Sequence, residues 1–371
     1  MKPVKLGMVG SGNVSNRYFE QAGRLDGVQF VATCSRHIEN AESKAKAYDV
    51  PRWYDNYETM MDQEELDAVV VTTPHSVHAE VALAALNRGL HVLNEKPMAT
   101  SFEDCRQMVE AAERNKVIFM SLPYDLNPAI VTALEYLTDE TIGKITGADV
   151  QLNIPGPPRD NWYYDKAVSH GGAILDCMVY PISRLITLLG PATSVTAEVN
   201  TLIPNRIVGG GKRIRSDVDD NATAIVEFAQ GQHAVVRTLW GTSFRQNNTI
   251  IYGRKGTIAL HDGGFPLVIH SPERPIPDAE QVSWRGIQEC YAPKLRDSDL
   301  SEKDMMSHFI HSVRSGQQPK QSARQQLHVH EIMFGAYRSA ESGQRYTLST
   351  TFEPFHAMAG PEMFDTKSDY I

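Results

Sequence analysis

The sequence has few cysteines, no long apolar run and no run of basic residues, and each absence excludes a class of protein. Its four cysteines lie far apart without a CxxC pair, which suits reduced thiols in a cytoplasm. No apolar stretch approaches the ~20 residues that a membrane-spanning helix needs. The first residues lack the apolar core and cleavage site of a signal peptide. A net charge of -9 argues against nucleic acid as a partner. Together these absences predict a cytoplasmic protein with neither nucleic acid nor membrane as a partner.

The length of 371 residues exceeds what one hydrophobic core usually organises, so two domains are expected. We predict a dinucleotide-binding Rossmann domain over residues 1–122. Residues 123–371 are predicted to form an α+β domain that binds substrate and mediates oligomerisation. The change of pattern after about Leu122 marks the boundary between the two.

Strand and helix patterns alternate along the first 120 residues. The predicted strands are 4–9, 28–34, 67–71, 91–93 and 117–120, and the predicted helices are 14–25, 39–48, 78–88 and one that opens at Ser101. Asp104, three residues after Ser101, completes a pair that resembles a capping box. Strands that alternate with helices of this length imply parallel pairing, and hence a doubly wound sheet.

Beyond residue 122 the strands are longer and the helices between them are few. The predicted strands are 145–152, 194–200, 222–228, 233–239 and 249–258, with helices over 303–314 and 323–339. A turn signal at Gln230-Gly231 indicates an antiparallel hairpin, whereas the glycine-rich segment 204–212 is predicted to be a loop. We expect an open, mainly antiparallel sheet that helices cover on one face. The other face is a candidate surface for self-association.

A glycine turn, Gly10-Ser11-Gly12-Asn13-Val14-Ser15, follows the first strand and opens the first helix. The first glycine permits the tight turn, and the second lets the backbone approach a pyrophosphate. The helix N-terminus would supply free N–H groups and a positive dipole end. Ser15 stands where a third glycine is common, which the packing tolerates if the residue is small. The context predicts a dinucleotide site.

The end of the second strand bears on the choice of cofactor. An NAD site commonly places a carboxylate about 20 residues past the glycines, but Ser35 and Arg36 occupy that position here. A serine hydroxyl and an arginine fork suit a ribose 2′-phosphate. The sequence therefore favours NADP(H) over NAD(H), although Glu39 lies close enough to serve an NAD ribose instead.

Several motifs follow in order along nearly the whole chain. Residues 89–97 read GLHVLNEKP, residues 73–78 read TPHSVH, and residues 171–176 read GGAILD, with Tyr180 four residues further on. Later landmarks lie at 218–222, 253–257 and 337–343. Together they resemble the glucose–fructose oxidoreductase/inositol dehydrogenase (Gfo/Idh/MocA) family. This resemblance implies a sugar or polyol substrate and a homodimer or homotetramer.

Oxidation of a secondary alcohol requires hydride transfer to nicotinamide and removal of the hydroxyl proton. Lys96 stands at the carboxyl edge of a predicted parallel strand, and Pro97 restricts it towards extended geometry. Asp176 and Tyr180, four residues apart, would share one face of a helix, and Pro181 places Tyr180 near its start. A nearby ammonium lowers the pKa of a phenol. We predict that Tyr180 exchanges the proton, Lys96 tunes it and Asp176 holds the substrate, roles similar to those in the family.

The other predicted site residues line the cofactor crevice or the substrate pocket. The predicted cofactor contacts are Gly10, Gly12, Asn13, Val14, Ser35, Arg36, Thr73, Pro74, His75, His78, Glu95 and Lys96. Tyr124, Trp162 and His170 are candidates for substrate contact, although core packing of Trp162 and a structural hydrogen bond of His170 are alternatives. His75 and His78 have no acidic or thiol partner at a recognisable spacing, so no metal site is predicted. His328 and His330 are interpreted as surface or core residues.

These observations predict an NAD(P)-dependent oxidoreductase that acts on a secondary hydroxyl, keto or anomeric carbon of a sugar, cyclitol or related polyol. Two alternatives remain open: a non-catalytic dinucleotide-binding regulator, and a dehydrogenase of non-sugar diols. Retention of Lys96, Asp176 and Tyr180 together favours an enzyme, because a sensor needs no proton-handling set.

Overall fold

The computed structural model describes residues 3–138, 141–158, 162–262, 264–296 and 304–354. These residues form two compact units. The first unit comprises 3–124, 167–170 and 304–330, and the second comprises 125–166, 171–296 and 331–354. The division into a Rossmann domain over residues 1–122 and a substrate-binding domain over residues 123–371 stays a prediction.

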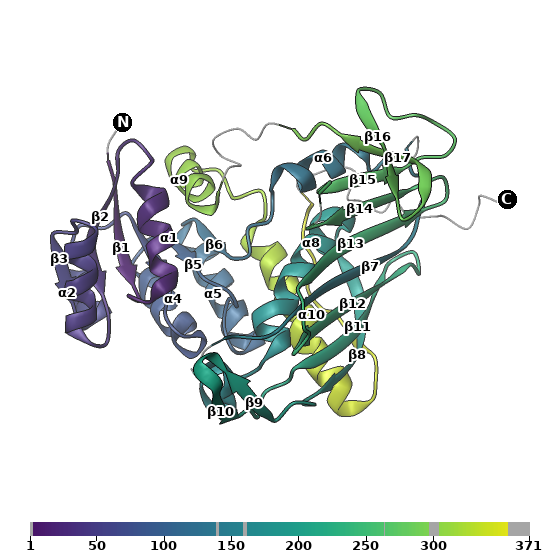
Figure 1. The fold of residues 1–371 in the computed structure, drawn as a ribbon. Coiled ribbons are helices and arrows are strands. Elements are labelled where there is room, and N and C mark those ends of the chain that lie inside the picture. Colours follow the sequence, from purple (N-terminus) through teal and green to yellow (C-terminus); the bar gives the residue numbers. More distant parts are fainter. Residues whose placement is uncertain (1–2, 139–140, 159–161, 263, 297–303, 355–371) are drawn as a thin grey trace. The chain divides into compact units, whose positions relative to one another are not determined.

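The first unit contains a six-stranded sheet with the order β3-β2-β1-β4-β5-β6, in which all neighbours are parallel (Figure 1). Its strands are β1 (Val4–Val9), β2 (Val28–Cys34), β3 (Arg52–Tyr54), β4 (Ala68–Val71), β5 (His91–Asn94) and β6 (Phe119–Ser121). The strand order reverses between β1 and β4, the switch point where ligands bind outside the carboxyl ends of the strands. The predicted doubly wound parallel sheet is thus confirmed.

Helices connect the strands of this sheet, and most were expected from the sequence. They are α1 (Asn13–Ala22), α2 (Ile38–Ala47), α3 (Tyr57–Gln63), η1 (His75–Val77), α4 (His78–Asn87) and α5 (Phe102–Asn115). The Ser101 hydroxyl accepts a hydrogen bond from the Asp104 amide at 3.1 Å, so the predicted helix start is confirmed. The strand β3 was not predicted, because three residues are too few to show a strand period. The helix α3, with seven residues, was not predicted either.

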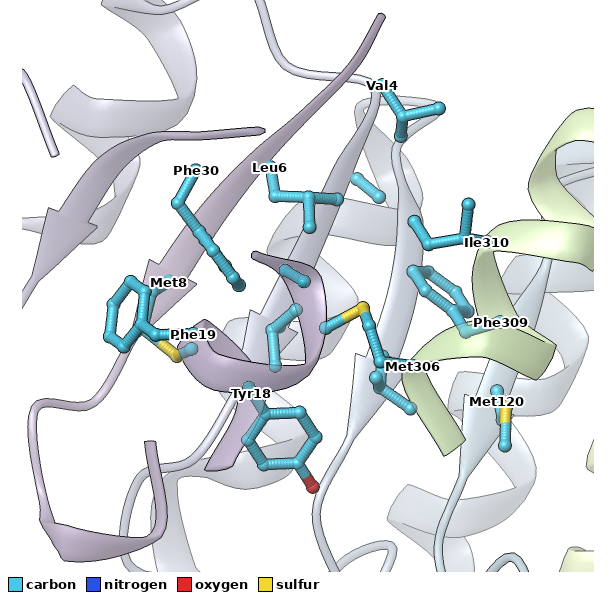
Figure 2. Close-up of a cluster of buried hydrophobic side chains, with 14 of the residues drawn as sticks. Val4, Leu6, Met8, Tyr18, Phe19, Phe30, Met120, Met306, Phe309 and Ile310 are labelled. Carbon is cyan, nitrogen blue, oxygen red and sulfur yellow. The ribbon is translucent and has the colours of Figure 1, made fainter. Parts of the chain in front are cut away.

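A hydrophobic cluster on one side of this sheet includes a helix from much later in the chain. The helix α9 (Met305–Ser315) contributes Met306, Phe309 and Ile310, which pack with Leu6 and Tyr18 (Figure 2). All five side chains are almost fully buried. Burial of such side chains stabilises a fold by about 1.5–3 kcal/mol each. The packing fixes α1, which carries the glycine turn at its N-terminus.

The second unit contains a ten-stranded sheet with the order β16-β17-β15-β14-β13-β7-β12-β11-β8-β18. Its strands are β7 (Ile145–Ile154), β8 (Ala192–Asn200), β11 (Asn221–Phe228), β12 (His233–Trp240), β13 (Gln246–Gly253), β14 (Thr257–His261), β15 (Leu267–His270), β16 (Ala279–Trp284), β17 (Ile287–Pro293) and β18 (Tyr346–Thr347). Only the β7–β12 pair is parallel among these described strands. The predicted mainly antiparallel sheet is confirmed.

Two local predictions for this unit were wrong. The single strand expected over 249–258 is two strands, β13 and β14, joined by a turn. A Cβ atom on Gly256 in that turn would collide with the carbonyl oxygen of His270. The loop expected over 204–212 contains β9 (Asn205–Val208) and η4 (Gly209–Gly211), which lead into β10 (Lys212–Arg215) of a two-stranded hairpin. In the first place, the turn Gly253-Arg254-Lys255-Gly256 is short and has strand residues on both sides; in the second, the glycine cluster obscured the short strands beside it.

Helices cover one face of the large sheet, as expected. The remaining helices are α6 (Pro128–Tyr136), η2 (Trp162–Tyr164), α7 (Lys166–Ser169), η3 (Ile174–Met178), α8 (Val179–Leu189) and α10 (Ala323–Ser342), of which α10 begins in the first unit and ends in the second. Along β12, Ala234, Val236 and Trp240 are buried, whereas Arg237 between them is exposed.

No helix in the described ranges is both long enough and apolar enough to cross a membrane.

Candidate functional site

The glycine turn after β1 depends on a glycine at its first position. Gly10 has φ +106°, a conformation that L side chains rarely adopt. A Cβ atom there would lie 2.6 Å from the carbonyl carbon of Thr72, which follows β4. The Gly10 amide donates to the carbonyl oxygen of Cys34 at the end of β2, at 2.9 Å. The turn is therefore held among the carboxyl ends of three neighbouring strands.

The N-terminus of α1 has the features of an anion-binding site. Gly12 caps the helix without a side-chain hydrogen bond, and no acidic residue lies in the first turn. A Cβ atom on Gly12 would meet no atom within 4 Å, so space remains beside the first N–H groups. Ser15 is fully buried, and its hydroxyl donates to the Gly12 carbonyl at 2.7 Å. Free N–H groups and the positive dipole end together attract a phosphate.

Two buried hydroxyl groups at the same edge have no hydrogen-bond partner within the described part of the chain. They are the Oγ of Ser11, after β1, and the Oγ1 of Thr73, after β4. Because most buried polar groups are hydrogen-bonded in native proteins, unpaired hydroxyls point to a missing ligand. The switch point between β1 and β4 thus fits the pyrophosphate of a dinucleotide. Asn13 and Val14, in the first turn of α1, are exposed beside it.

The predicted ribose-binding residues follow β2, the neighbour of β1. The Ser35 amide donates to the Tyr54 carbonyl of β3 at 3.1 Å, which fixes the backbone at this point. Arg36 is exposed, and Glu39 is exposed in the first turn of α2. The position suits the recognition of an adenosine ribose.

Glu95 joins α1 to the segment that follows β5. Its buried carboxylate accepts hydrogen bonds from the Arg17 guanidinium at 2.8 Å and the Tyr18 hydroxyl at 2.7 Å. The Lys96 amide donates to its other oxygen at 3.0 Å. Burial raises the pKa of Tyr18 well above its ordinary value, and the adjacent carboxylate raises it further. Glu95 thus holds the backbone of Lys96 next to the helix of the glycine turn.

The two histidines of the TPHSVH segment are buried. The ring nitrogens of His78 lie 2.7 Å from the Pro97 carbonyl oxygen and 2.9 Å from that of Thr73, an arrangement that joins the two loops. These contacts are typical of a structural histidine and not of a metal ligand. Burial lowers the pKa of His75 well below its ordinary value, and His78 and Lys96 lower it further. His75 follows Pro74 directly and begins η1.

His330, on α10, holds the segment that follows β5 through a hydrogen bond to Met98. The sequence predicted no role for His330 at this segment. Its Nε2 accepts a hydrogen bond from the Met98 amide at 2.7 Å, so its Nδ1 must carry the proton that it shares with the Gln326 carbonyl at 2.7 Å. Burial lowers the pKa of His330 to about 4, which agrees with a neutral ring. His328 and His330 are both core residues. The sequence spacing alone gave no sign of this contact.

In the second unit, two glycines and an aspartate fix the start of η3. The Asp219 carboxylate accepts from the amides of Gly172 at 2.7 Å and Ile174 at 2.8 Å, and from the Tyr337 hydroxyl at 2.6 Å. Cβ atoms on Gly171 and Gly172 would collide with the Tyr337 hydroxyl and the Asp219 carbonyl, respectively. The motif at 218–222 was noted in the sequence, but this capping role of Asp219 was not.

Asp176 and Tyr180 lie on two consecutive helical elements. Asp176 is on η3, a π-helical turn, and Tyr180 is the second residue of α8, near its start as expected from Pro181. A π turn is wider than the α turn that the spacing argument assumed, and such turns are common at functional sites. Asp176 is buried and Tyr180 is partly buried. Met178 between them is fully buried in the core.

The predicted substrate contacts occupy different surroundings. Trp162 stacks on Tyr163 with ring centroids 4.0 Å apart. His170 is exposed and has φ +62°, an uncommon conformation for a residue with a side chain. Tyr124 stacks on His308 of α9 at 4.6 Å. Their contact with a substrate stays a prediction.

The three predicted catalytic residues are divided between the two units. Lys96 belongs to the first unit, and Asp176 and Tyr180 belong to the second. The joint action of the three residues stays a prediction.

Two family models match most of the chain. Residues 4–122 match the Gfo/Idh/MocA oxidoreductase family, NAD-binding Rossmann fold. Residues 130–259 match the GFO/IDH/MocA C-terminal domain. The two matches follow the order of the two predicted halves.

Curated relatives are identical to the chain at about a quarter of the aligned positions. Levoglucosan dehydrogenase of Pseudarthrobacter phenanthrenivorans is 25% identical over 292 residues, which cover 70% of this chain and 74% of that protein. Trans-1,2-dihydrobenzene-1,2-diol dehydrogenase of Danio rerio is 28% identical over 262 residues, or 69% of this chain and 74% of that protein. The NADP(+)-dependent scyllo-inositol 2-dehydrogenase IolU of Bacillus subtilis is 24% identical over 280 residues, covering 73% and 78%.

Solved structures show the same fold. Levoglucosan dehydrogenase in complex with NADH and L-sorbose superposes with a TM-score of 0.79 at 20% identity, covering 94% of this chain and 100% of that chain. GenD2 from gentamicin A biosynthesis in complex with NAD superposes with a TM-score of 0.74 at 21% identity, covering 94% and 97%. At these identities the likeness is one of fold.

The open space at Gly12 yields a first prediction. A Gly12→Ala substitution should leave the free energy of unfolding within about 0.5 kcal/mol of wild type, because the new methyl meets no protein atom. It should weaken NADPH binding about tenfold or more, because the methyl takes the place of the pyrophosphate. Urea unfolding and titration calorimetry measure the two effects. Gly264→Ala, at an equally open position, is the control; equal NADPH affinity in both variants would contradict the assignment.

Protonation of His330 should make stability depend on pH. The folded-state pKa of about 4 lies below the unfolded value of about 6.5. The contribution of the neutral His330 ring to the free energy of unfolding is therefore complete above pH 6.5. It is lost as the pH falls towards 4, because in this range only the unfolded chain takes up the proton. His330→Gln should reduce the slope of unfolding free energy against pH in this window by up to about 1.4 kcal/mol per pH unit.

Urea unfolding at a series of pH values measures the slope. His233→Gln, at an exposed histidine, serves as the control. An unchanged slope in the His330→Gln protein would show that this ring is not held neutral by burial.

Proposed function

Because the chain belongs to the Gfo/Idh/MocA oxidoreductase family, an NAD(P)-dependent group, we propose that it transfers a hydride between nicotinamide and a secondary hydroxyl, keto or anomeric carbon of a sugar, cyclitol or related polyol. The observation that carries this proposal is the open N-terminus of α1 beside two unpaired buried hydroxyls. A dinucleotide pyrophosphate satisfies both features. Relatives named for levoglucosan and scyllo-inositol support the substrate class.

The residues predicted to hold the cofactor come from the carboxyl ends of successive strands. The amides of Asn13 and Val14 would face the pyrophosphate, with the hydroxyls of Ser11 and Thr73 beside it. Bound nicotinamide supplies the hydride acceptor or donor. Lys96 follows the buried Glu95 at the same edge, so its backbone is held by the carboxylate that also binds Arg17 and Tyr18 of α1.

Proton handling is assigned to three side chains. Tyr180 removes the proton from the substrate hydroxyl as the hydride leaves its carbon, and it returns the proton in the reverse direction. The Lys96 ammonium orients the hydroxyl and favours the phenolate form of the tyrosine. Asp176 accepts hydrogen bonds from substrate hydroxyls, a role that its burial strengthens because fewer water molecules compete.

We also infer a preference for NADP(H). Arg36 is exposed immediately after β2, beside Ser35, and no carboxylate occupies either position. A guanidinium and a hydroxyl provide donors for a 2′-phosphate, whereas an NAD ribose calls for an acceptor. The inositol dehydrogenase relative is named for NADP(+), although solved relatives hold NAD or NADH.

A dehydrogenase of non-sugar diols is the second candidate. Relatives named trans-1,2-dihydrobenzene-1,2-diol dehydrogenase are up to 28% identical to this chain over the aligned residues. The same proton-handling set serves either substrate class, so substrate tests must separate them. A non-catalytic regulator is less well supported, since it has no use for Asp176, Tyr180 and Lys96 together.

The proposed self-association concerns the face of the large sheet away from its helices. Ile225 and Tyr252 are exposed there, with 46% and 37% of their surface accessible. The homodimer or homotetramer and the cytoplasmic location stay predictions.

Turnover assays test the enzyme proposal directly. Absorbance at ~340 nm, where reduced nicotinamide absorbs, is followed with aldoses, cyclitols, keto-sugars and aromatic diols, each with NADP(H) and NAD(H). Tyr180→Phe should lower kcat about a hundredfold or more while cofactor affinity is retained, because only the proton exchange is lost. Turnover that survives in the Tyr180→Phe protein would contradict the assigned role. Cofactor binding without any turnover would favour the regulator.

Arg36→Ala should reverse the cofactor preference. The affinity for NADPH should fall about tenfold or more, because a charge-assisted hydrogen bond is lost, and the affinity for NADH should change little. Arg114→Ala, at an exposed arginine of α5, controls for the change in net charge. Equal losses for both cofactors would disprove a contact between Arg36 and the 2′-phosphate.

A further inference from the structure

A chain of two hydrogen bonds leads from Trp240 to Asp176. The indole Nε1 of Trp240 donates to the Sγ atom of Cys177 at 3.1 Å. The Cys177 thiol donates to Oδ2 of Asp176 at 3.4 Å. All three residues belong to the second unit and are buried, with 2%, 3% and 8% of their surface exposed in the order of the chain of bonds.

The direction of both bonds follows from the chemistry of the three groups. An indole nitrogen can only donate, and an ionised carboxylate can only accept. The thiol between them therefore accepts from the indole and directs its own proton to the carboxylate. Acceptance of the first bond polarises the thiol and strengthens the second bond.

The first member of this chain is held firmly. Trp240 ends β12, where its amide donates to the Asp220 carbonyl at 2.7 Å and its carbonyl accepts from Arg206 at 3.2 Å. Its ring meets the Tyr164 ring edge to face at 5.8 Å. The buried ion pair between Arg206 and Asp220, at 2.8 Å, fixes both neighbours of the Trp240 backbone. The indole is thus a fixed point from which the thiol is oriented.

We propose that Cys177 and Trp240 are positioning residues that hold the Asp176 carboxylate in the orientation that binds substrate hydroxyls. The proposal rests on the proposed function, in which Asp176 holds the substrate. The hydrogen bond from the thiol restricts rotation of the carboxylate plane on the wide turn of η3. The carboxylate is then already oriented before the substrate binds, so substrate binding loses less conformational entropy in ordering it.

Variants of Cys177 separate this role from simple packing. Cys177→Val fills the site with an apolar side chain about one methyl group larger and removes both hydrogen bonds. It should raise KM about fivefold while kcat stays within about twofold. Cys177→Ser keeps a donor and an acceptor, and it should restore most of the wild-type KM although it packs less well. Cys290→Val, at another buried cysteine of the second unit, is the matched control.

A double-mutant cycle shows whether the effect passes through Asp176. In an Asp176→Asn background, Cys177→Val should add little to the loss in kcat/KM, because the group that it positions is already changed. Additive losses, or a Cys177→Ser protein as impaired as Cys177→Val, would overturn the proposal. A wild-type KM in the Cys177→Val protein would also overturn it.

Nuclear magnetic resonance of the indole groups tests the hydrogen bonds without any turnover. The Trp240 indole N–H signal, identified by its loss in Trp240→Phe, should shift in Cys177→Val and stay near its wild-type position in Cys290→Val. An unshifted signal in Cys177→Val would overturn the proposal. If wild type turns over no tested substrate but the signal shifts as expected, the proposed function fails and the bond to the thiol stands.

Discussion

The carboxylate of Glu95 is buried between a helix and a loop, and it accepts hydrogen bonds from both. Arg17 and Tyr18 reach it from α1, and the Lys96 amide reaches it from the segment after β5. A buried carboxylate is costly without partners, and the hydrogen bonds from α1 and from the Lys96 amide offset this cost. The helix that opens at the glycine turn and the backbone of the proposed catalytic lysine are therefore held by one group.

The second unit relies on a comparable arrangement. Asp219 accepts from two amides at the start of η3 and from the Tyr337 hydroxyl, and the absence of side chains at Gly171 and Gly172 permits this approach. The helical turn that bears Asp176 begins from this point. In both units, a buried carboxylate orders the backbone, and the proposed chemical groups lie within a few residues of it.

Much of the fold and part of the site could be predicted from the sequence. Strand periodicity and glycine placement identified the parallel sheet and the turn at Gly10, because these signals are local. The sequence did not reveal that His330 accepts from Met98 or that Asp219 caps η3, since each contact joins residues far apart in the chain. The division of 249–258 into two strands was missed although Gly253-Arg254-Lys255-Gly256 is a turn signal, because strand residues flank it closely on both sides.

The proposed roles of the other residues depend on the binding of a dinucleotide at the carboxyl edge of the parallel sheet. A crystal structure of the protein with NADPH tests this most directly. The pyrophosphate should lie against the first amides of α1, beside the hydroxyls of Ser11 and Thr73, and the 2′-phosphate should lie within hydrogen-bonding distance of Ser35 and Arg36. A nucleotide bound elsewhere, or one whose pyrophosphate makes no contact with the first turn of α1, would contradict a dinucleotide site at this edge of the sheet.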